Sequence, residues 1–345
     1  MGVMLNFVGP REVGFEEYDE RKLNQNEIRL KTLYSGISAG TELTAYRGSN
    51  PYLSKKWNAD LRIFENTETT TYSYPLKAWG YEEVGQVIEV GEEVKDIKIG
   101  DIIFGTWGHK STHIIEESFA KDRKLIEGLE PICGIYSHIG AIALNSILDA
   151  NIHVGETVAI FGQGVPGQIV TQLAKLSGAK VVAVDLDDER LKFSKESGAD
   201  VVLNPKNDDV PRMIKEITKG RGADVSIEIS GSTKALHEAI RATAYSGRVV
   251  AAGFFQGEGV GLYLGEEFHH NRINVVCSQI SGVSPELTYR WNRLRLNHTI
   301  MELQHENKIN LKKLITHEFN FSDAKKAFEM LDTRTDCMQM VLKFD

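Results

Sequence analysis

Cysteine and long apolar runs are both scarce in this sequence. The three cysteines, Cys133, Cys277 and Cys337, lie far apart and form no Cys-x-x-Cys pair. Their odd number and wide spacing exclude a disulfide framework and a cysteine-rich structural zinc site, so we expect a reducing, cytoplasmic compartment. No apolar run approaches the ~18 residues of a membrane span, and MGVMLNFVGPREVGFEE lacks the basic-then-apolar pattern of a signal peptide.

Positive charge is also in deficit. The chain has 40 Lys and Arg against 48 Asp and Glu, which gives a net charge of −8. Such a chain has no general attraction for nucleic acid or for an anionic membrane surface. Its 345 residues, 41% of them hydrophobic, are typical of a globular protein of about two domains. We therefore expect a small molecule as its partner.

The pattern of the chain changes near residue 130. Before it, short strand-like runs such as EEVGQVIEV and GDIIFGTWG alternate with turns. From 155 to 283, six apolar strand runs alternate with helical stretches, which indicates a parallel sheet covered on both faces. Six such strands match a doubly wound nucleotide-binding domain. After it, we expect a helix over 284–307 capped by Ser284, a second capped helix over 322–331, and a strand over 338–344.

The strongest motif is FGQGVPGQI at 161–169. It places Gly162, Gly164 and Gly167 in a Gly-x-Gly-x-x-Gly pattern between an apolar strand and an amphipathic helix. The first glycine permits a tight turn, the second lets a pyrophosphate approach, and the third lets helix and strand pack closely. The helix N-terminus then supplies free N–H groups for phosphates. The alternative, a glycine-rich turn without a ligand, requires strand, helix and a following acid to coincide by chance.

That acid is Asp185, at the end of the next strand. A carboxylate there accepts hydrogen bonds from the adenosine ribose and repels a 2′-phosphate, which favours NAD over NADP. The full set of expected cofactor contacts is Gly162, Gly164, Val165, Pro166, Gly167, Asp185, Arg190, Gly253 and Phe254.

The order of a β-rich region, a nucleotide domain and a β return resembles the medium-chain dehydrogenase/reductase superfamily, the relatives of zinc alcohol and sorbitol dehydrogenases. The resemblance rests on GISAGTEL (36–43), GYEEVGQVIEVG (80–91), IKIGDIIFG (97–105) and the fingerprint with its acid. It implies an α/β protein with a GroES-like catalytic domain (1–130), a Rossmann NAD-binding domain (131–283) and a C-terminal return (284–345). It also implies an active site in the cleft against the nucleotide domain.

The resemblance fails at the catalytic zinc. Where the family has cysteine, Gly-His-Glu and a later cysteine or glutamate, this chain has Ser38 or Ala39, the tripeptide Gly80-Tyr81-Glu82, and Ser137 or His138. Losing both thiolate and imidazole removes the usual ligands, so we expect no catalytic zinc. Residual metal binding through Glu82 and His138 is the open alternative. The GYE form looks like the branch that contains bacteriochlorophyllide dehydrogenase, although a chlorin substrate does not follow from it.

Without zinc, a side chain must exchange the proton of the alcohol. The candidates are Tyr81, Glu82, His138 and Thr41, of which Thr41 matches the hydroxyl that relays the proton in zinc relatives. The alternatives are that Tyr81 only fills the vacated pocket and that His138 is an ordinary helix histidine. We expect His109 and His113 to serve a strand edge or a cleft wall.

Residues 44–79 are rich in aromatic side chains and look longer than the matching segment of sorbitol-type relatives. Such a segment suits either a lid over a flat or sugar-like substrate or a surface insertion packed on its own rings. The apolar run INVVCSQI (273–280) ends the nucleotide sheet, and because exposed edges are usually paired, we expect a homodimer or a dimer of dimers.

These observations predict an NAD-dependent oxidoreductase acting on a secondary alcohol of polyol, sugar or cyclitol type. One rival is a zinc-free quinone or enoyl reductase, although such enzymes usually favour NADPH. The other is an NAD-binding sensor or structural protein without turnover.

Overall fold

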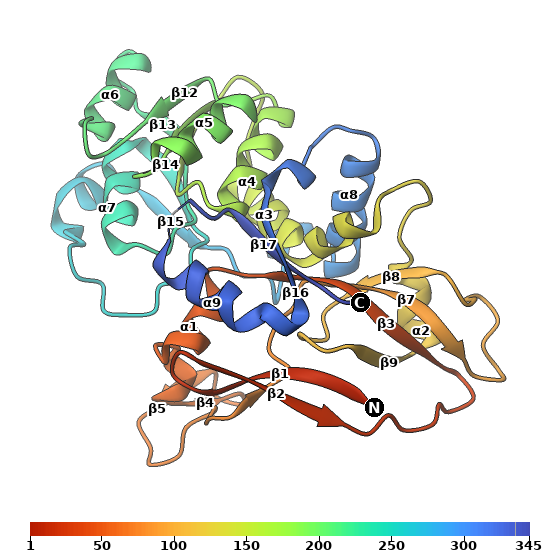
Figure 1. The fold of residues 1–345 in the computed structure, drawn as a ribbon. Helices are drawn as coiled ribbons and strands as arrows, with labels where there is room; N and C mark the ends of the chain where they lie inside the picture. Colours follow the sequence, from red (N-terminus) through yellow and green to blue (C-terminus); the bar gives the residue numbers. More distant parts are fainter. Residues whose placement is uncertain (335) are drawn as a thin grey trace. The chain divides into compact units, whose positions relative to one another are not determined.

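The computed structural model describes residues 1–334 and 336–345 and divides them into two units (Figure 1). The first unit comprises Met1–His138 and Lys312–Asp345, and the second comprises Ile139–Leu311. The unit boundaries thus fall at 138 and 311, whereas 130 and 283 were expected. The second boundary lies after the expected position because α8 (Arg293–His305) packs against α3 (Tyr136–Ala150) and so belongs to the second unit. The two helices are in close contact, since a Cβ added to Gly140 of α3 would lie 2.6 Å from the side chain of Ile300 of α8.

The second unit is built on a six-stranded parallel sheet of strand order β12-β11-β10-β13-β14-β15. This order reverses beside β10 and is the doubly wound arrangement expected from the strand–helix alternation. The strands are β10 (Thr157–Phe161), β11 (Lys180–Val184), β12 (Val201–Leu203), β13 (Ala223–Glu228), β14 (Thr243–Ala251) and β15 (Asn274–Cys277).

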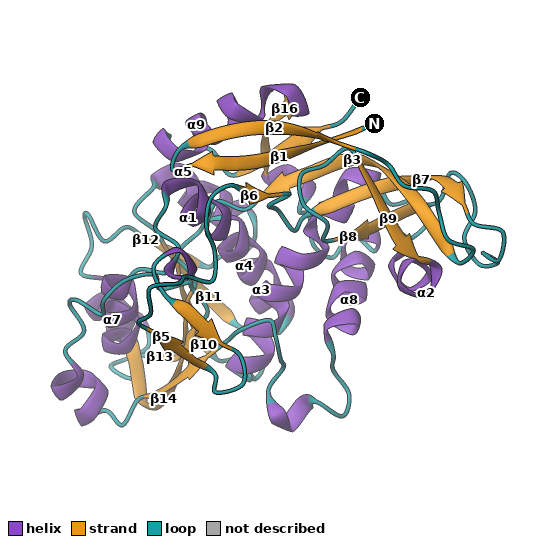
Figure 2. Cartoon of the chain, turned by 90° about the horizontal axis from the view of Figure 1, so that it is seen from below, coloured by secondary structure: helices purple, strands orange, loops and turns teal. Residues whose placement is uncertain are grey.

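Helices cover both faces of this sheet. They are α4 (Val165–Leu176), α5 (Asp188–Glu196), α6 (Val210–Ile217) and α7 (Thr233–Ala242). Ala159 and Phe161 of β10 share a buried cluster with Ile214 of α6 and Leu236 of α7. Figure 2 shows α7 and α4 on opposite sides of the strands. Because both faces are covered, β10 and β11 carry almost continuous apolar residues, whereas β13 also buries Ser226 and Glu228.

Two expected helix limits are wrong. The helix expected over 284–307 begins only at Arg293, where Asn292 accepts the backbone N–H of Arg295 at 2.9 Å, while Ser284 forms no side-chain cap. The second helix, α9 (Ala324–Thr333), also lacks a side-chain cap. Ser/Thr/Asn/Asp residues occur at several turns of such segments, and pattern alone does not tell which of them faces a free N–H group.

The first unit is β-rich. Its main sheet has the strand order β16-β17-β3-β7-β8, with β9 also paired to β3, and a smaller sheet has the order β2-β1-β6. The strands are β1 (Gly2–Gly9), β2 (Glu12–Tyr18), β3 (Glu27–Ile37), β4 (Lys56–Asn58), β5 (Ile63–Glu65), β6 (Leu76–Lys77), β7 (Glu83–Val90), β8 (Ile102–Gly105), β9 (Thr112–Glu116), β16 (Ile315–Asn320) and β17 (Gln339–Lys343). The helices are α1 (Thr41–Arg47), α2 (Glu117–Ala120) and α9.

The C-terminal strand completes this sheet. β17 pairs antiparallel with β3, so that Val341 lies opposite Gly36 although the two residues are far apart in sequence. A buried aromatic group anchors the same region, in which Phe7 contacts Tyr46 of α1 and Phe328 of α9 at ring-centroid distances of 5.8 and 5.1 Å. Elements from both termini of the chain, β1 and β17, therefore pack in the region of the end of β3.

One stretch is more apolar than the sequence analysis allowed. By length and composition, Pro131–Ala150, with a mean hydropathy of 1.3 in its most apolar window, could cross a membrane. However, 83% of that window is buried inside the protein. Core helices pass the same test, and this burial explains the composition.

Candidate active site

Three chain segments of the first unit bring the expected catalytic residues together. They are the turn between β3 and α1, which carries Ser38 and Thr41, the turn before β7, which carries Tyr81 and Glu82, and the start of α3, which carries His138. The first two segments are joined directly, because the backbone N–H of Gly36 donates to the carbonyl of Glu82 at 2.8 Å.

Tyr81 lies at the centre of this group. Its hydroxyl donates to the Oγ of Ser38, and its ring meets the His138 ring edge-on, with centroids 4.9 Å apart at 75°. Burial raises the pKa of the Tyr81 phenol, and the charges of Glu82 and Glu42 raise it further, against the hydrogen bonds from Ser38 and Thr41. The phenol therefore stays protonated at neutral pH, and its single proton is donated to Ser38.

Glu82 is buried behind the phenol. Its side chain is 1% exposed, and its Oε2 accepts a hydrogen bond from the Nε2 of Gln339 at 3.3 Å. Burial raises the pKa of Glu82 well above its usual range, and the neighbouring carboxyl groups of Glu42 and Glu83 add to this effect. A carboxyl group in such surroundings favours its neutral form.

Among the neighbouring candidates, the structure shows which of them contact Tyr81. Of Ser38 and Ala39, it is Ser38 whose hydroxyl meets Tyr81, and of Ser137 and His138, it is the His138 ring that contacts Tyr81. Thr41 is the first residue of α1, and its side chain hydrogen-bonds to the same phenol. All four expected catalytic residues thus lie in one group, and their roles stay predictions.

This group does not fit a family zinc site. At the three ligand positions, the Ser38 hydroxyl and the Tyr81 phenol bond to each other, and burial disfavours the phenolate. The imidazole of His138 is then the only good zinc ligand of the three, whereas catalytic zinc requires three protein ligands. We therefore derive no step of the chemistry from zinc.

Sequence analysis missed the ionisable groups beneath Tyr81. Glu42, Glu83 and His109 are each fully buried, and the Nε2 of His109 lies 2.7 Å from the Oε2 of Glu42. The ring has no exposed surface and so does not line a cleft wall, whereas the His109 carbonyl accepts the backbone N–H of Leu5 on β1 at 2.9 Å, in agreement with the alternative of a strand edge. A usable signal was present in EEVGQVIEV, where Glu83 shares the strand face of the buried residues Gly85 and Val87.

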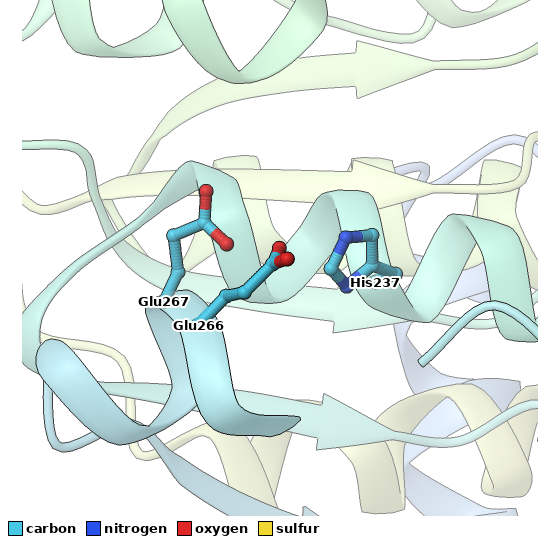
Figure 3. A group of neighbouring side chains, drawn as sticks. All are labelled: His237, Glu266 and Glu267. Atoms are coloured by element: carbon cyan, nitrogen blue, oxygen red, sulfur yellow. The ribbon is translucent and has the colours of Figure 1, made fainter. Parts of the chain in front are cut away.

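Another group with metal-ligand chemistry lies in the second unit (Figure 3). The ligand atoms of His237, Glu266 and Glu267 lie within 4.8 Å of one another, and the Glu266 carboxylate lies between the other two side chains. A tetrahedral ion with bonds of about 2.1 Å holds its ligand atoms only about 3.4 Å apart. Moreover, Arg241 already neutralises Glu267 at 3.3 Å, and Glu266 is exposed. We assign no ion to this group.

The glycine-rich turn after β10 has the geometry that a dinucleotide needs. Gly164 precedes α4, and a Cβ added to it would meet nothing nearer than the Cδ of Pro166 at 4.0 Å. In contrast, a Cβ on Gly167 would lie 1.9 Å from the carbonyl oxygen of Gly162, so helix and strand are in close contact. Val165 and Pro166 form the first turn of α4, next to the open space that phosphates occupy in such folds.

Asp185 follows β11 beside this turn. One carboxylate oxygen accepts the backbone N–H of Gln163 at 2.6 Å, and the other accepts that of Asp187 at 2.9 Å. The remaining expected contacts also follow strands or lie near them. Arg190 belongs to α5, and Gly253 and Phe254 follow β14, where the Gly253 N–H donates to the Glu228 carbonyl at 3.0 Å. The carboxyl ends of the strands are where doubly wound sheets bind their ligands.

Comparison of the sequence with known proteins finds dehydrogenases. Residues 166–293 match the family described as zinc-binding dehydrogenase. D-guloside 3-dehydrogenase of Shigella flexneri is 32% identical, over 92% of this chain and 93% of its own length. (R,R)-butanediol dehydrogenase of Bacillus subtilis is 26% identical over 91% of each chain.

Solved structures share the whole fold. An alcohol dehydrogenase of Escherichia coli CFT073 complexed with NADH has a TM-score of 0.78 at 20% identity, covering 99% of both chains. A zinc-binding dehydrogenase of Sinorhizobium meliloti 1021 bound to NADP has a TM-score of 0.78 at 19% identity, with the same coverage. The relatives are therefore alcohol and polyol dehydrogenases, and nicotinamide cofactors of both kinds occur on this fold.

Proposed function

Because the chain belongs to the zinc-binding dehydrogenase family, we propose that it is an NAD-dependent oxidoreductase that interconverts a secondary alcohol and a ketone without catalytic zinc. Bound NAD would accept the hydride from the carbinol carbon, while the hydroxyl proton passes to a side chain. The glycine turn 162–167 would hold the pyrophosphate, and Asp185 the adenosine ribose.

The observation that carries this proposal is the Tyr81 hydroxyl, which is held by Ser38 and Thr41 above buried carboxyl groups. To act on a ketone, the phenol would exchange its hydrogen bond to Ser38 for one to the ketone oxygen, where it would donate as negative charge develops during reduction. By microscopic reversibility, the group that donates this proton during reduction must accept it during oxidation, and Tyr81 could accept it only as the phenolate, which burial disfavours. His138, in contact with the ring, is then the alternative acceptor.

For the substrate, we propose an alcohol of polyol, sugar or cyclitol type. Support comes from the name of the 32% identical relative, a D-guloside 3-dehydrogenase. NAD is proposed over NADP because a carboxylate at Asp185 repels a 2′-phosphate. A homodimer is proposed on the exposed edge strand β15, where Val275 is 41% exposed.

The test is substrate-dependent formation of NADH by the purified protein. A panel of polyols, cyclitols and hexosides is offered with NAD and, separately, with NADP, after exhaustive treatment with a chelator and elemental analysis. Turnover with NAD in the metal-free protein supports the proposal. NAD binding without turnover on any member indicates a sensor, and NADPH-dependent reduction of quinones or enones indicates the rival reductase. If the protein contains a stoichiometric metal and the chelator that removes this metal also abolishes activity, the proposal of zinc-free chemistry is contradicted.

A further inference from the structure

We propose that His109 is a positioning residue of the candidate active site. In this inference, a buried hydrogen-bonded chain of Glu42, His109, Ser35 and Glu83, here called the His109 chain, fixes the two turns that carry Ser38 and Tyr81. The activity measurements that test it rest on the proposed function, whereas the spectroscopic measurement does not.

The imidazole is completely enclosed, and both of its nitrogens are bonded. Nε2 lies 2.7 Å from the Oε2 of Glu42, and Nδ1 lies 2.6 Å from the Oγ of Ser35. The other oxygen of Glu42 accepts the backbone N–H of Ser38 at 2.8 Å. The hydroxyl of that same Ser38 receives the Tyr81 hydrogen bond, so His109 is connected to the phenol through two residues.

On its other side, the chain ends at Glu83. The Ser35 hydroxyl lies 3.0 Å from one carboxylate oxygen of Glu83, and the backbone N–H of Trp107 lies 2.7 Å from the other. Each oxygen of Glu42 and Glu83 therefore has a donor. Buried polar groups so completely satisfied are typical of arrangements that hold a single geometry.

Counting protons gives the charge of the ring. The single hydroxyl proton of Ser35 donates to Glu83, so Ser35 can accept only from an N–H at Nδ1. Glu42 accepts at its Oε2, so Nε2 also carries a proton. With Glu42 and Glu83 both ionised, this pattern of bonds makes the ring an imidazolium, while burial raises the pKa of Glu83 and opposes its ionisation. Burial lowers the pKa of His109, but the charge and hydrogen bond of Glu42 and the charge of Glu83 outweigh this effect and raise it.

The second turn rests on the same ring. The backbone N–H of His109 donates to the carbonyl of Trp79 at 3.0 Å. Gly80 follows with φ +125°, and a Cβ there would lie 2.9 Å from the Cε1 of His109. Only glycine can occupy position 80, because any side chain there would collide with the His109 ring. His109 thus touches the turn of Tyr81 directly and reaches the turn of Ser38 through Glu42.

From this geometry we infer what the His109 chain does. The hydrogen bond between Tyr81 and Ser38 exists only if their two turns keep their relative places, and the His109 chain is bonded to both. Its loss shifts the phenol, and a misplacement of about 1 Å is enough to cost about 10²-fold in rate.

The kinetic test compares His109→Gln and Ser35→Ala with the control His153→Gln, whose side chain is 69% exposed. We expect both test variants to lower kcat by ~10-fold or more, with the Kd for NAD unchanged, and the control to match the original protein. In a Tyr81→Phe background, the same substitutions should lower kcat by less than ~2-fold, because residues that act through one another are non-additive. An equal loss in both backgrounds would overturn the inference.

A second measurement is independent of activity. In the full-length protein labelled with ¹⁵N-histidine, the His109 ring, assigned by its absence in His109→Gln or its shift in Ser35→Ala, should carry protons on both nitrogens at neutral pH. The Tyr81 ring signals should also move in Ser35→Ala and not in His153→Gln. If these results hold in a protein without turnover, the inference stands and the proposed function fails. A neutral His109 ring, or an unmoved Tyr81, refutes the inference whatever the activity.

Discussion

The two units of this protein bury different kinds of polar side chain. In the second unit, the buried polar side chains of the described residues are mostly amides and hydroxyls, such as Gln163 and Thr171, with Glu228 of β13 as a buried carboxyl. There the glycine turn offers its backbone to a ligand. In the first unit, the ends of β3 and β7 bury Glu42, Glu82, Glu83 and His109. Buried charges are costly unless paired, so such a concentration marks a place where side-chain chemistry matters.

This difference follows from what each unit would do. A pyrophosphate is recognised by N–H groups and close approach, which need glycine and a helix N-terminus rather than particular side chains. Proton exchange with an alcohol needs ionisable groups whose environment sets their pKa. Substitutions confined to one unit should therefore alter one property and leave the other intact.

The largest expected effect is that of Tyr81→Phe, which removes only the phenol oxygen. If Tyr81 donates to the substrate oxygen, kcat should fall by ~10²-fold or more, the scale of a lost general acid, while the Kd for NAD stays nearly unchanged. Steady-state kinetics and NAD titration check both numbers. Full activity in this variant would make Tyr81 a filler of the pocket and leave His138 or Thr41 as the donor.

The converse change is Asp185→Ser in the second unit. The preference for NAD over NADP should narrow by ~10-fold or more, because repulsion of the 2′-phosphate and the bonds to the ribose are both lost. Binding of each cofactor, measured by fluorescence titration, tests this. The preference of the unaltered protein is the decisive control, since tighter NADP binding there would contradict the assignment of NAD. With the preferred cofactor saturating, kcat should change little.

Subunit assembly should depend on the edge of the second unit's sheet. Replacing Val275 on β15 by lysine places a charge on the strand that we propose pairs with a second copy. We expect the dimer to dissociate at concentrations ~10-fold higher than for the original protein, as judged by light scattering over a dilution series. A protein that is monomeric at micromolar concentration before any substitution refutes the proposed dimer.

The smallest effect concerns stability in the first unit. Burial, together with the charge of Lys110, lowers the pKa of His113 from 6.5 to about 3. The unfolded chain therefore binds this proton more tightly, and stability falls as the pH drops below 6.5. Between pH 7 and 5.5, the original protein should lose about 1 kcal/mol more than His113→Phe, which keeps a ring stacked on Trp107. Urea unfolding at both pH values measures the difference, and parallel losses would show that His113 is not responsible.

Much of the second unit could be predicted because its signals are local. Strand runs, helix runs and the glycine spacing each lie within about 15 residues, and the six strands occur where the pattern placed them. The predicted start of α8 was wrong because both Ser284 and Asn292 are residue types that can cap a helix, and the sequence pattern does not select between them.

The candidate active site was predicted only in part. Tyr81, Glu82, His138 and Thr41 were found by resemblance to family motifs, and they do come together. The side-chain partners of His109 were not predicted because they lie 67 and 74 positions away in sequence. No periodicity reports a contact of this kind, and a lone histidine in a strand-rich segment gives no sign of the carboxylates that enclose it.

The aromatic residues of 44–79 form a continuous series of ring contacts. Trp57 meets Phe64 at 4.9 Å, Phe64 meets Tyr52 at 5.3 Å, Tyr52 meets Tyr72 at 5.1 Å, and Tyr72 meets Trp79 at 5.3 Å. Because tyrosine can transfer excitation to a tryptophan at such short range, we expect Trp57 and Trp79 to emit part of the light absorbed by Tyr52 and Tyr72. Two of the protein's four tryptophans thus lie at the two ends of this series of rings. Trp57 belongs to β4, and Trp79 directly precedes Gly80. We therefore expect the tryptophan emission of the protein to change when a molecule binds against the turn of Tyr81.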